Sequence, residues 1–204
     1  MNNAISFKSK IRFVDKNTFV NTASGKEIEP ENRPAAFAER YYIPTVRTCT
    51  GGGILSPNNE AYGFHIYDGE NTNKTVANRL KLDILLLDET PESALIIGSK
   101  KHPSRPYSQK NFSIIKNCLE KHIKNVTLFE EHTDNFAQSS LHYDLKTDTY
   151  TILTQFFKDG KEECVKTLAD LLGIFKNIKI ANGDELFIGK QQILKDFCPK
   201  IFRK

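Results

Sequence analysis

The stretch Ser93-Ala94-Leu95-Ile96-Ile97-Gly98 and the residues after it, 109–124 and 126–129, decide the fold class. The first run is apolar and ends at a glycine, which is typical of a buried central strand. Residues 109–124 predict an amphipathic helix with Ser108 as N-cap, because apolar side chains recur there at helical spacing. Residues 126–129 predict another strand. We therefore expect an α/β (α+β) fold, with a mixed β-sheet or two packed sheets and flanking helices.

Working outward, apolar alternation and turn residues predict the remaining elements. Strands are expected at 41–50, 61–67 and 80–87, and Gly51–Gly53 are expected to form a loop after the first of these. Hairpins are expected over 10–20, 141–153 and 178–188, and helices over 35–40, 165–175 and 191–197. The expected organisation is an N-terminal extension, 1–42, a core, 43–153, and a C-terminal extension, 154–204.

Composition narrows the classes of function. The chain has 204 residues, is 39% hydrophobic and carries a net charge of +4, with lysines scattered among acids as in residues 158–163. These values suit a globular protein and do not favour nucleic-acid binding. The longest apolar run, Ile84–Leu87, is too short to span a bilayer, and the N-terminus lacks a secretory signal. We expect a cytoplasmic site of synthesis, with export to a host cell without a classical signal peptide left open.

Four cysteines stand at 49, 118, 164 and 198, with no spacing typical of a metal site. We expect free thiols and no metal. Cys118 and His122 lie one helical turn apart, but a core cysteine and a surface histidine are the better interpretation. His132 with Asp134, and His142 with Asp144, are weaker candidates for acid–base pairs.

Cys49 is the main candidate nucleophile. A predicted strand leads to it, and three glycines follow Thr50, so backbone N–H groups there could approach an oxyanion. A buried structural cysteine beside a turn is an equally good interpretation of this context alone. If Cys49 is catalytic, we expect its pKa to be depressed.

His65 lies 16 residues later on the next predicted strand, sharing a face with Gly63 and Tyr67. Neighbouring strands can bring a thiol and an imidazole within hydrogen-bond reach, and that contact activates the nucleophile. A core or surface histidine is the more ordinary interpretation of His65 taken alone.

Residues 45–49 and 63–66 together resemble the bacterial chemoreceptor glutamine deamidases (CheD), in which a threonine-bearing strand leads to a cysteine and a histidine follows on the next strand. The resemblance covers residues 43–153. The catalytic domains of cytotoxic necrotizing factors show a similar order of cysteine and histidine. This chain differs in having Gly98-Ser99 where the family has two glycines, and Asn135-Phe136 where it has an arginine-bearing segment.

The resemblance implies roles for residues near the pair. Thr45 is the candidate for the family's supporting threonine, and Ile43, Thr45 and Thr48 are candidates for a backbone carbonyl that orients His65. Backbone groups at Thr48, Thr50 and Gly51 are candidates for positioning and for an oxyanion site.

The function so implied is cysteine-dependent deamidation of a glutamine side chain in a target protein, as in a bacterial effector or toxin, with no cofactor. Transglutamination is a close variant. The alternative is a non-enzymatic protein-binding module that retains a deamidase-like fold. Because Arg47 is the only basic residue close to Cys49 in sequence, we expect no charged clamp for free glutamine and place partner contacts in the two extensions.

Overall fold

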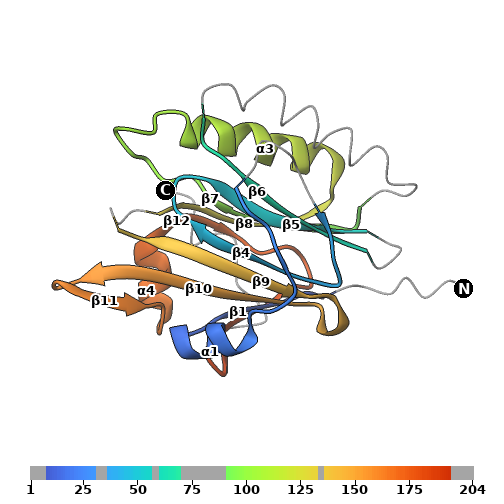
Figure 1. Ribbon diagram of the computed structural model, residues 1–204. Helices are drawn as coiled ribbons and strands as arrows, with labels where there is room; N and C mark the ends of the chain where they lie inside the picture. Colours follow the sequence, from blue (N-terminus) through green and yellow to red (C-terminus); the bar gives the residue numbers. More distant parts are fainter. Residues whose placement is uncertain (1–7, 31–35, 57–59, 70–90, 133–135, 194–204) are drawn as a thin grey trace, which may run out of the picture.

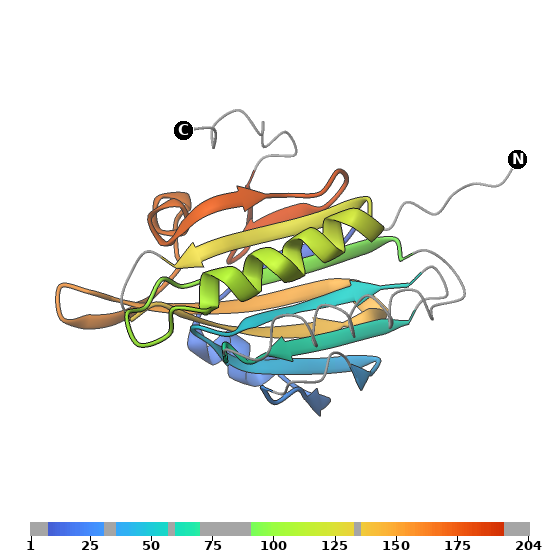
Figure 2. The same cartoon turned by 90° about the horizontal axis from the view of Figure 1, so that it is seen from above.

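The computed structural model describes residues 8–30, 36–56, 60–69, 91–132 and 136–193. Two mixed β-sheets lie face to face, with helix α3 (Ser108–His122) over the outer face of one and helix α1 (Lys16–Thr22) against the other, as Figure 1 shows. The view from above in Figure 2 shows α3 running along the strands beneath it. The predicted mixed fold with two packed sheets and flanking helices is confirmed.

The six-stranded sheet holds the strands on which the candidate site is built. Its order is β12 (Phe175–Lys179), β8 (Asn125–His132), β7 (Ser93–Gly98), β5 (Thr50–Leu55), β6 (Ala61–Ile66) and β3 (Ala36–Phe37). Only β7 and β8 pair in parallel, joined by α3. The strand–helix–strand prediction is therefore confirmed.

The eight-stranded sheet combines strands from both ends of the chain. Its order is β14 (Gln191–Gln192), β13 (Glu185–Ile188), β1 (Lys10–Phe13), β10 (Thr149–Lys158), β9 (Gln138–Asp144), β4 (Arg40–Val46) and β2 (Lys26–Glu27), and β11 (Lys161–Cys164) also pairs with β10. Strand β1 is parallel to both β10 and β13. The predicted extensions and core thus contribute neighbouring strands to one sheet.

Alternation within β7 explains its continuous apolar sequence. Leu95 and Ile97 belong to the core between the sheets, whereas Ala94 and Ile96 belong to the core beneath α3. A strand buried on both faces needs no polar positions, which is why the run Ala94–Ile97 is entirely apolar.

The glycines after Cys49 lie in β5, so the predicted loop is wrong. A Cβ on Gly52 would lie 2.1 Å from the Leu95 carbonyl oxygen, and one on Gly53 would lie 1.9 Å from the Tyr41 hydroxyl. The glycines are required because neighbouring strands and the facing sheet approach β5 too closely for a side chain.

Several other predictions fail for physical reasons. The hairpin over 10–20 is wrong, because Asp15 caps helix α1 by accepting from the Thr18 N–H at 2.9 Å. The hairpin over 178–188 is also wrong, because β12 and β13 belong to different sheets. The helix over 35–40 is replaced by the strands β3 and β4.

The hairpin over 141–153 and one further helix form where the sequence predicted them. The hairpin is confirmed, with a 3-10 turn at Leu145–Thr147, and helix α4 (Leu168–Ile174) confirms the helix expected over 165–175. Residues 191–192 form β14 and Ile193 is not helical, where a helix was expected; residues 194–197 of that prediction, like the strand at 80–87, lie outside the described residues. Among the described helices, none is long and apolar enough to cross a membrane.

Candidate functional site

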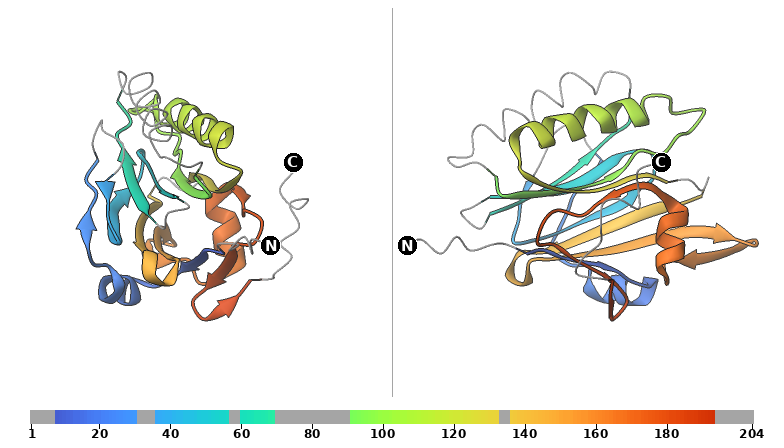
Figure 3. Two further views of the ribbon diagram at one scale, coloured as in Figure 1. Left: turned by 90° about the vertical axis from the view of Figure 1, so that its right-hand side faces the viewer. Right: turned by 180° about the vertical axis from the view of Figure 1, so that it is seen from behind.

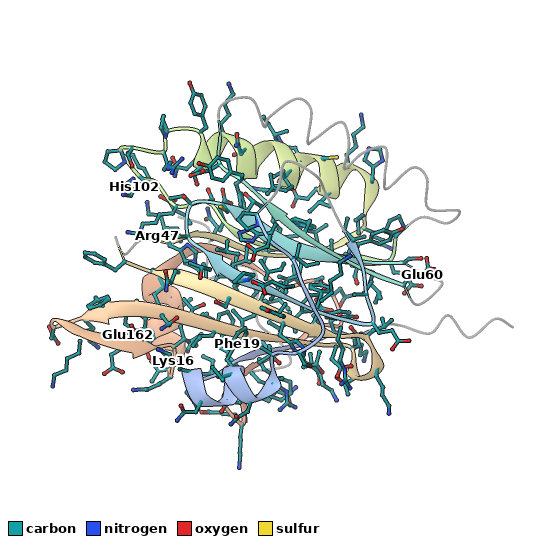
Figure 4. The ribbon with its side chains drawn as sticks, viewed as in Figure 1. Lys16, Phe19, Arg47, Glu60, His102 and Glu162 are labelled. Carbon is teal, nitrogen blue, oxygen red and sulfur yellow. The ribbon has the colours of Figure 1, made fainter. Side chains whose placement is uncertain are left out.

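Cys49 lies where the chain crosses from one sheet to the other. Residues 47–49 form a bend between β4 of the eight-stranded sheet and β5 of the six-stranded sheet, and Cys49 is half-buried there. Figure 4 shows Arg47 and His102 at this end of the molecule and Glu60 at the opposite end. The two views of Figure 3 show the same sandwich from the side and from behind.

The first turn of α3 fixes both strand ends around Cys49. The prediction that Ser108 caps this helix is wrong, because the N-cap position is Tyr107. The Ser108 hydroxyl instead donates to the Thr48 carbonyl at 2.6 Å. One turn later, the Asn111 side-chain amide donates to the Gly69 carbonyl at 3.2 Å. Both side chains are buried, so the bend before β5 and the segment after β6 are held against one helix end.

The surroundings of Cys49 raise its pKa. Burial contributes most and the negative charge of Asp68 comes next, and together they raise the pKa of the thiol to about 11, against opposing contributions from the Asp68 backbone N–H and the Arg105 charge. The expectation of a depressed pKa is therefore wrong. At pH 7 the resting nucleophile is a thiol, with a thiolate fraction on the order of one in ten thousand.

His65 is a buried, neutral imidazole on β6. Its Nδ1 lies 3.2 Å from the Ile28 carbonyl oxygen, and its Nε2 is buried without a hydrogen-bond partner. Burial lowers the pKa of His65 to about 4. Since a carbonyl only accepts, Nδ1 carries the proton and Nε2 presents a bare lone pair.

Strand register relates the two candidate catalytic residues. Gly51 lies directly opposite His65, so these two positions share the face that looks toward the other sheet. Cys49 precedes Gly51 by two residues at the same strand end. The expected hydrogen bond between the Cys49 thiol and the His65 imidazole is absent: Nδ1 lies against the Ile28 carbonyl, and Nε2 has no hydrogen-bond partner.

None of the residues proposed to orient His65 supplies the carbonyl that its Nδ1 contacts. Ile43 is a fully buried core side chain, and Thr45 is an exposed residue of β4 with φ 45° whose N–H donates to the Ser140 hydroxyl. The Thr48 carbonyl is occupied by Ser108. The carbonyl that orients His65 is that of Ile28, which sequence reasoning missed because residue 28 is 37 positions away.

The other proposed positioning residues belong to the sheet. Thr50 is buried and lies opposite Ile66, whose side chain packs beneath α3. Gly51 is paired on both sides, with β6 and with β7.

Asp68 and Arg105 complete the surroundings of Cys49, and the sequence had not singled them out. The Asp68 side chain is 1% exposed and forms an ion pair with Arg105 at 3.6 Å. Arg105 also donates to the Tyr67 hydroxyl at 2.6 Å and lies over its ring. The fold thus brings a second basic residue, Arg105, near Cys49, in addition to Arg47, which is close to it in sequence. The polar sequence after the His65 strand was the only signal.

Two further buried histidines were weighed as alternatives. His132 Nε2 lies 3.0 Å from the Ser139 hydroxyl, and burial and the nearby Lys100 charge lower the pKa of His132 to about 3. His142 is buried with both ring nitrogens unpartnered, and its predicted partner Asp144 forms an ion pair with Arg40 at 2.9 Å. Asp134 lies outside the described residues. The Ser139 hydroxyl beside His132 is fully buried and also bonds to the Thr154 hydroxyl at 2.8 Å, so a substrate cannot reach it as a nucleophile.

Two other features lie away from Cys49. A cavity of about 1040 Å³ opens at the far end of β6, between Gly25, Arg40, Glu60 and Asp144. In the described part of the chain, no group of three or more histidine, cysteine or acidic side chains could hold a metal ion. The cavity is distinct from the cysteine site, because neither Cys49 nor His65 lines it.

Comparison with models of known protein families found none that matches this chain, and comparison with curated proteins found no similar sequence.

Proposed function

We propose that this protein is a cysteine-dependent amidohydrolase that deamidates a glutamine side chain, with Cys49 as nucleophile and His65 as general base. The observation that carries the proposal is the state of His65. Its Nδ1 is held by the Ile28 carbonyl, and its bare Nε2 lies on the strand paired with the one that follows Cys49. A buried imidazole nitrogen without a partner is costly, by about 1–3 kcal/mol, and a catalytic base accounts for that cost.

The proposed reaction needs only the chain's own groups and water. His65 Nε2 takes the Cys49 proton while the sulfur bonds to the carboxamide carbon and the carbonyl electrons move to oxygen. Protonated His65 gives that proton to the departing nitrogen, so ammonia leaves and a thioester forms. Water attacks the thioester, with His65 taking its proton and returning it to the Cys49 sulfur. The products are glutamate and ammonia.

The oxyanion site is reassigned in this proposal. Gly51 is paired on both sides within the sheet, so its N–H is not the best donor. Backbone hydrogen bonds from Asp68 and from Cys49 itself to the Cys49 sulfur lower the pKa of the thiol. When that sulfur bonds to the carboxamide carbon, the oxyanion on the same carbon would lie within reach of these N–H groups.

The resting protein holds a neutral pair, not a thiolate and an imidazolium. The pKa of Cys49 is about 11 and that of His65 about 4. Moving the proton without substrate would therefore cost on the order of 10 kcal/mol. The proposal requires the sulfur to reach Nε2 when substrate binds; catalytic hydrogen bonds in free enzymes are often long and tighten only in the complex.

The surface around Cys49 favours a glutamine within a protein as substrate. Among the described residues, the large exposed apolar side chains are Val20, Tyr67, Phe136 and Phe157. Tyr67 directly follows β6, the strand that carries His65, and Phe136 and Phe157 contact one another with ring centroids 5.3 Å apart. The pair flanks the end of β9 and β10 where β4 turns toward Cys49. Exposed aromatic side chains are enriched in protein interfaces.

The second candidate is a non-enzymatic protein-binding module. Two observations favour it: the raised pKa of Cys49 and the absence of a hydrogen bond between Cys49 and His65. The same exposed aromatic side chains would then bind a partner without chemistry following.

The experiment is to incubate the protein with bacterial and animal cell lysates and, separately, with free glutamine, and to map glutamine-to-glutamate conversion by mass spectrometry. Added amine distinguishes transglutamination, because the amine is then incorporated. Cys49→Ser and His65→Gln should each abolish conversion. Matched controls are Cys164→Ser and His122→Gln, which make the same chemical changes in the described fold away from the site and should leave conversion intact.

The outcomes separate the candidates. Specific conversion in a lysate that depends on Cys49 and His65 supports the proposal. Rapid turnover of free glutamine shows that the substrate is the amino acid. Conversion that survives both substitutions contradicts the assigned residues. If no substrate is converted and a bound protein is recovered from the lysate, the result favours the binding module.

A further inference from the structure

Asp68 is an unexpected neighbour for a nucleophilic cysteine. Its negative charge raises the pKa of Cys49, which makes the thiolate harder to form. Its side chain is 1% exposed, so the charge is little screened by water. A site that required only a reactive thiolate would place a cation in this position, as other activated cysteines do.

The Asp68 carboxylate also lacks hydrogen-bond donors. Both of its oxygens are buried without a hydrogen-bond partner, and Arg105 lies 3.6 Å away, beyond ordinary hydrogen-bond length. A buried carboxylate normally accepts several hydrogen bonds, so Asp68 has an unused capacity for donors. The Arg105 side chain is itself directed to Tyr67, to whose hydroxyl it donates at 2.6 Å.

We propose that Asp68 is the amide-binding residue of the site, accepting the carboxamide N–H group of the substrate beside the Cys49 sulfur. This inference rests on the proposed function and adds the element that distinguishes substrate from product. A primary amide presents two N–H donors, and a carboxylate acceptor binds them well. The Asp68 backbone forms a hydrogen bond to the Cys49 sulfur and the Asp68 charge acts on the same thiol, so both parts of the residue belong to the surroundings of the nucleophile.

The same charge would expel the product. Hydrolysis turns the neutral carboxamide into a carboxylate, which has no donor for Asp68 and carries a like charge. Like charges at a poorly solvated site repel, so glutamate would leave and rebind weakly. Arg105 would moderate this repulsion from the solvent side, where its side chain is 46% exposed.

A pair of alkylating reagents tests the proposal without assuming any activity. The same thiolate attacks the CH2 carbon of iodoacetamide or iodoacetate and displaces iodide from it, and the two reagents differ only in carrying a carboxamide or a carboxylate. The ratio of their rates at one cysteine cancels the thiolate fraction. Peptide mapping by mass spectrometry at mildly alkaline pH gives this ratio for Cys49 and for Cys164 in the same sample.

Asp68→Asn should lower the Cys49 rate ratio, amide over acid, roughly tenfold or more, because it removes the charge that favours the amide reagent. Arg105→Gln should raise the ratio, because it removes the only cation paired with Asp68 in the described residues. The Cys164 ratio should not change in either variant. Asp144→Asn is the matched control: it removes a carboxylate from another arginine pair, Arg40–Asp144, and should leave the Cys49 ratio unchanged.

The results decide the proposal independently of deamidation. A Cys49 ratio in the unaltered protein that equals that of Cys164, or one that both Asp68→Asn and Arg105→Gln leave unchanged, overturns it. If Asp68→Asn fails to fold, the direction of the Arg105→Gln shift alone decides, because a ratio that stays constant or falls contradicts an anionic acceptor. Deamidation found without the ratio shift would refute the role of Asp68 and leave the proposed function standing.

Discussion

His65 is held by the backbone of Ile28, a residue 37 positions earlier in the chain: Nδ1 lies 3.2 Å from the Ile28 carbonyl oxygen. Ile28 belongs to the segment after β2, and its own N–H donates to the Tyr42 carbonyl at 2.9 Å. The edge of the eight-stranded sheet therefore sets the proton position on an imidazole of the six-stranded sheet. A backbone carbonyl performs this role with any side chain at residue 28.

The tautomer of His65 should be observable directly. Because Nδ1 faces a carbonyl and Nε2 has no partner, the neutral ring should carry its proton on Nδ1 at pH 7. Long-range nitrogen–proton correlation spectra distinguish the two ring nitrogens, and His65→Gln identifies the signals. A proton found on Nε2 would show that the ring does not donate to Ile28 and would remove the proposed base.

Alkylation of Cys49 should be slow near neutral pH and should accelerate steeply in alkali. A thiol with a pKa of about 11 gains about tenfold in thiolate for each pH unit up to that value. Quenched iodoacetamide labelling across pH, read by peptide mapping, measures this profile. Asp68→Asn should move the Cys49 profile to lower pH, since the Asp68 charge raises that pKa. A plateau near pH 7 would contradict the described surroundings of the thiol.

Gly52→Ala should destabilise the protein by about 3 kcal/mol or more, because the added Cβ would lie 2.1 Å from the Leu95 carbonyl oxygen. Gly173→Ala is the matched control. Gly173 lies in α4, and no atom lies within 4 Å of its added Cβ, so this change should stabilise by about 0.5–1 kcal/mol. Denaturant unfolding measures both changes. Equal stability of the two variants would refute the close-packing explanation of the glycines.

Local sequence patterns predicted much of the fold. The strand Ser93–Gly98, helix α3 and the β9–β10 hairpin carry local periodic patterns, and all three were predicted. Gly51–Gly53 were misjudged because glycine signals both loops and close packing, and only the positions of Leu95 and Tyr41 distinguish these.

The site was less accessible to sequence reasoning than the fold. Cys49 and His65 were identified by type and spacing, whereas Ile28, Asp68 and Arg105 acquire their roles through contacts that no local pattern encodes. The pKa of Cys49 was predicted in the wrong direction for the same reason, since burial and Asp68 determine it.

Helix α1 forms where a hairpin was predicted, because the cap at Asp15 outweighs the β propensity of the residues that follow. Residues 18–20 have β propensity, but Asp15 accepts from the Thr18 N–H and Phe19 packs with Val14 and Leu153. Asp15→Ala should therefore cost about 1 kcal/mol in the free energy of unfolding, whereas Asp15→Ser, which keeps a capping oxygen, should cost less. Denaturant unfolding of both variants checks this, and equal losses would show that the cap does not stabilise α1.

The protein should lose stability as pH falls from about 6.5 to about 4, partly through His65. Burial lowers the folded pKa of His65 to about 4, below the unfolded value of about 6.5. The unfolded chain therefore binds an extra proton in this window, so the stability from neutral His65 is complete above pH 6.5 and is lost toward pH 4, by on the order of 3 kcal/mol. His132 and His142, whose pKa values burial also lowers, add to the slope across the same window, and carboxylates add to it at the acidic end. The test therefore compares His65→Gln with the unaltered protein by denaturant unfolding between pH 5 and 6.5, where the difference in slope isolates His65. The variant should show the shallower dependence there; identical slopes would mean that His65 titrates normally in the folded protein and is not the buried neutral base proposed for the site.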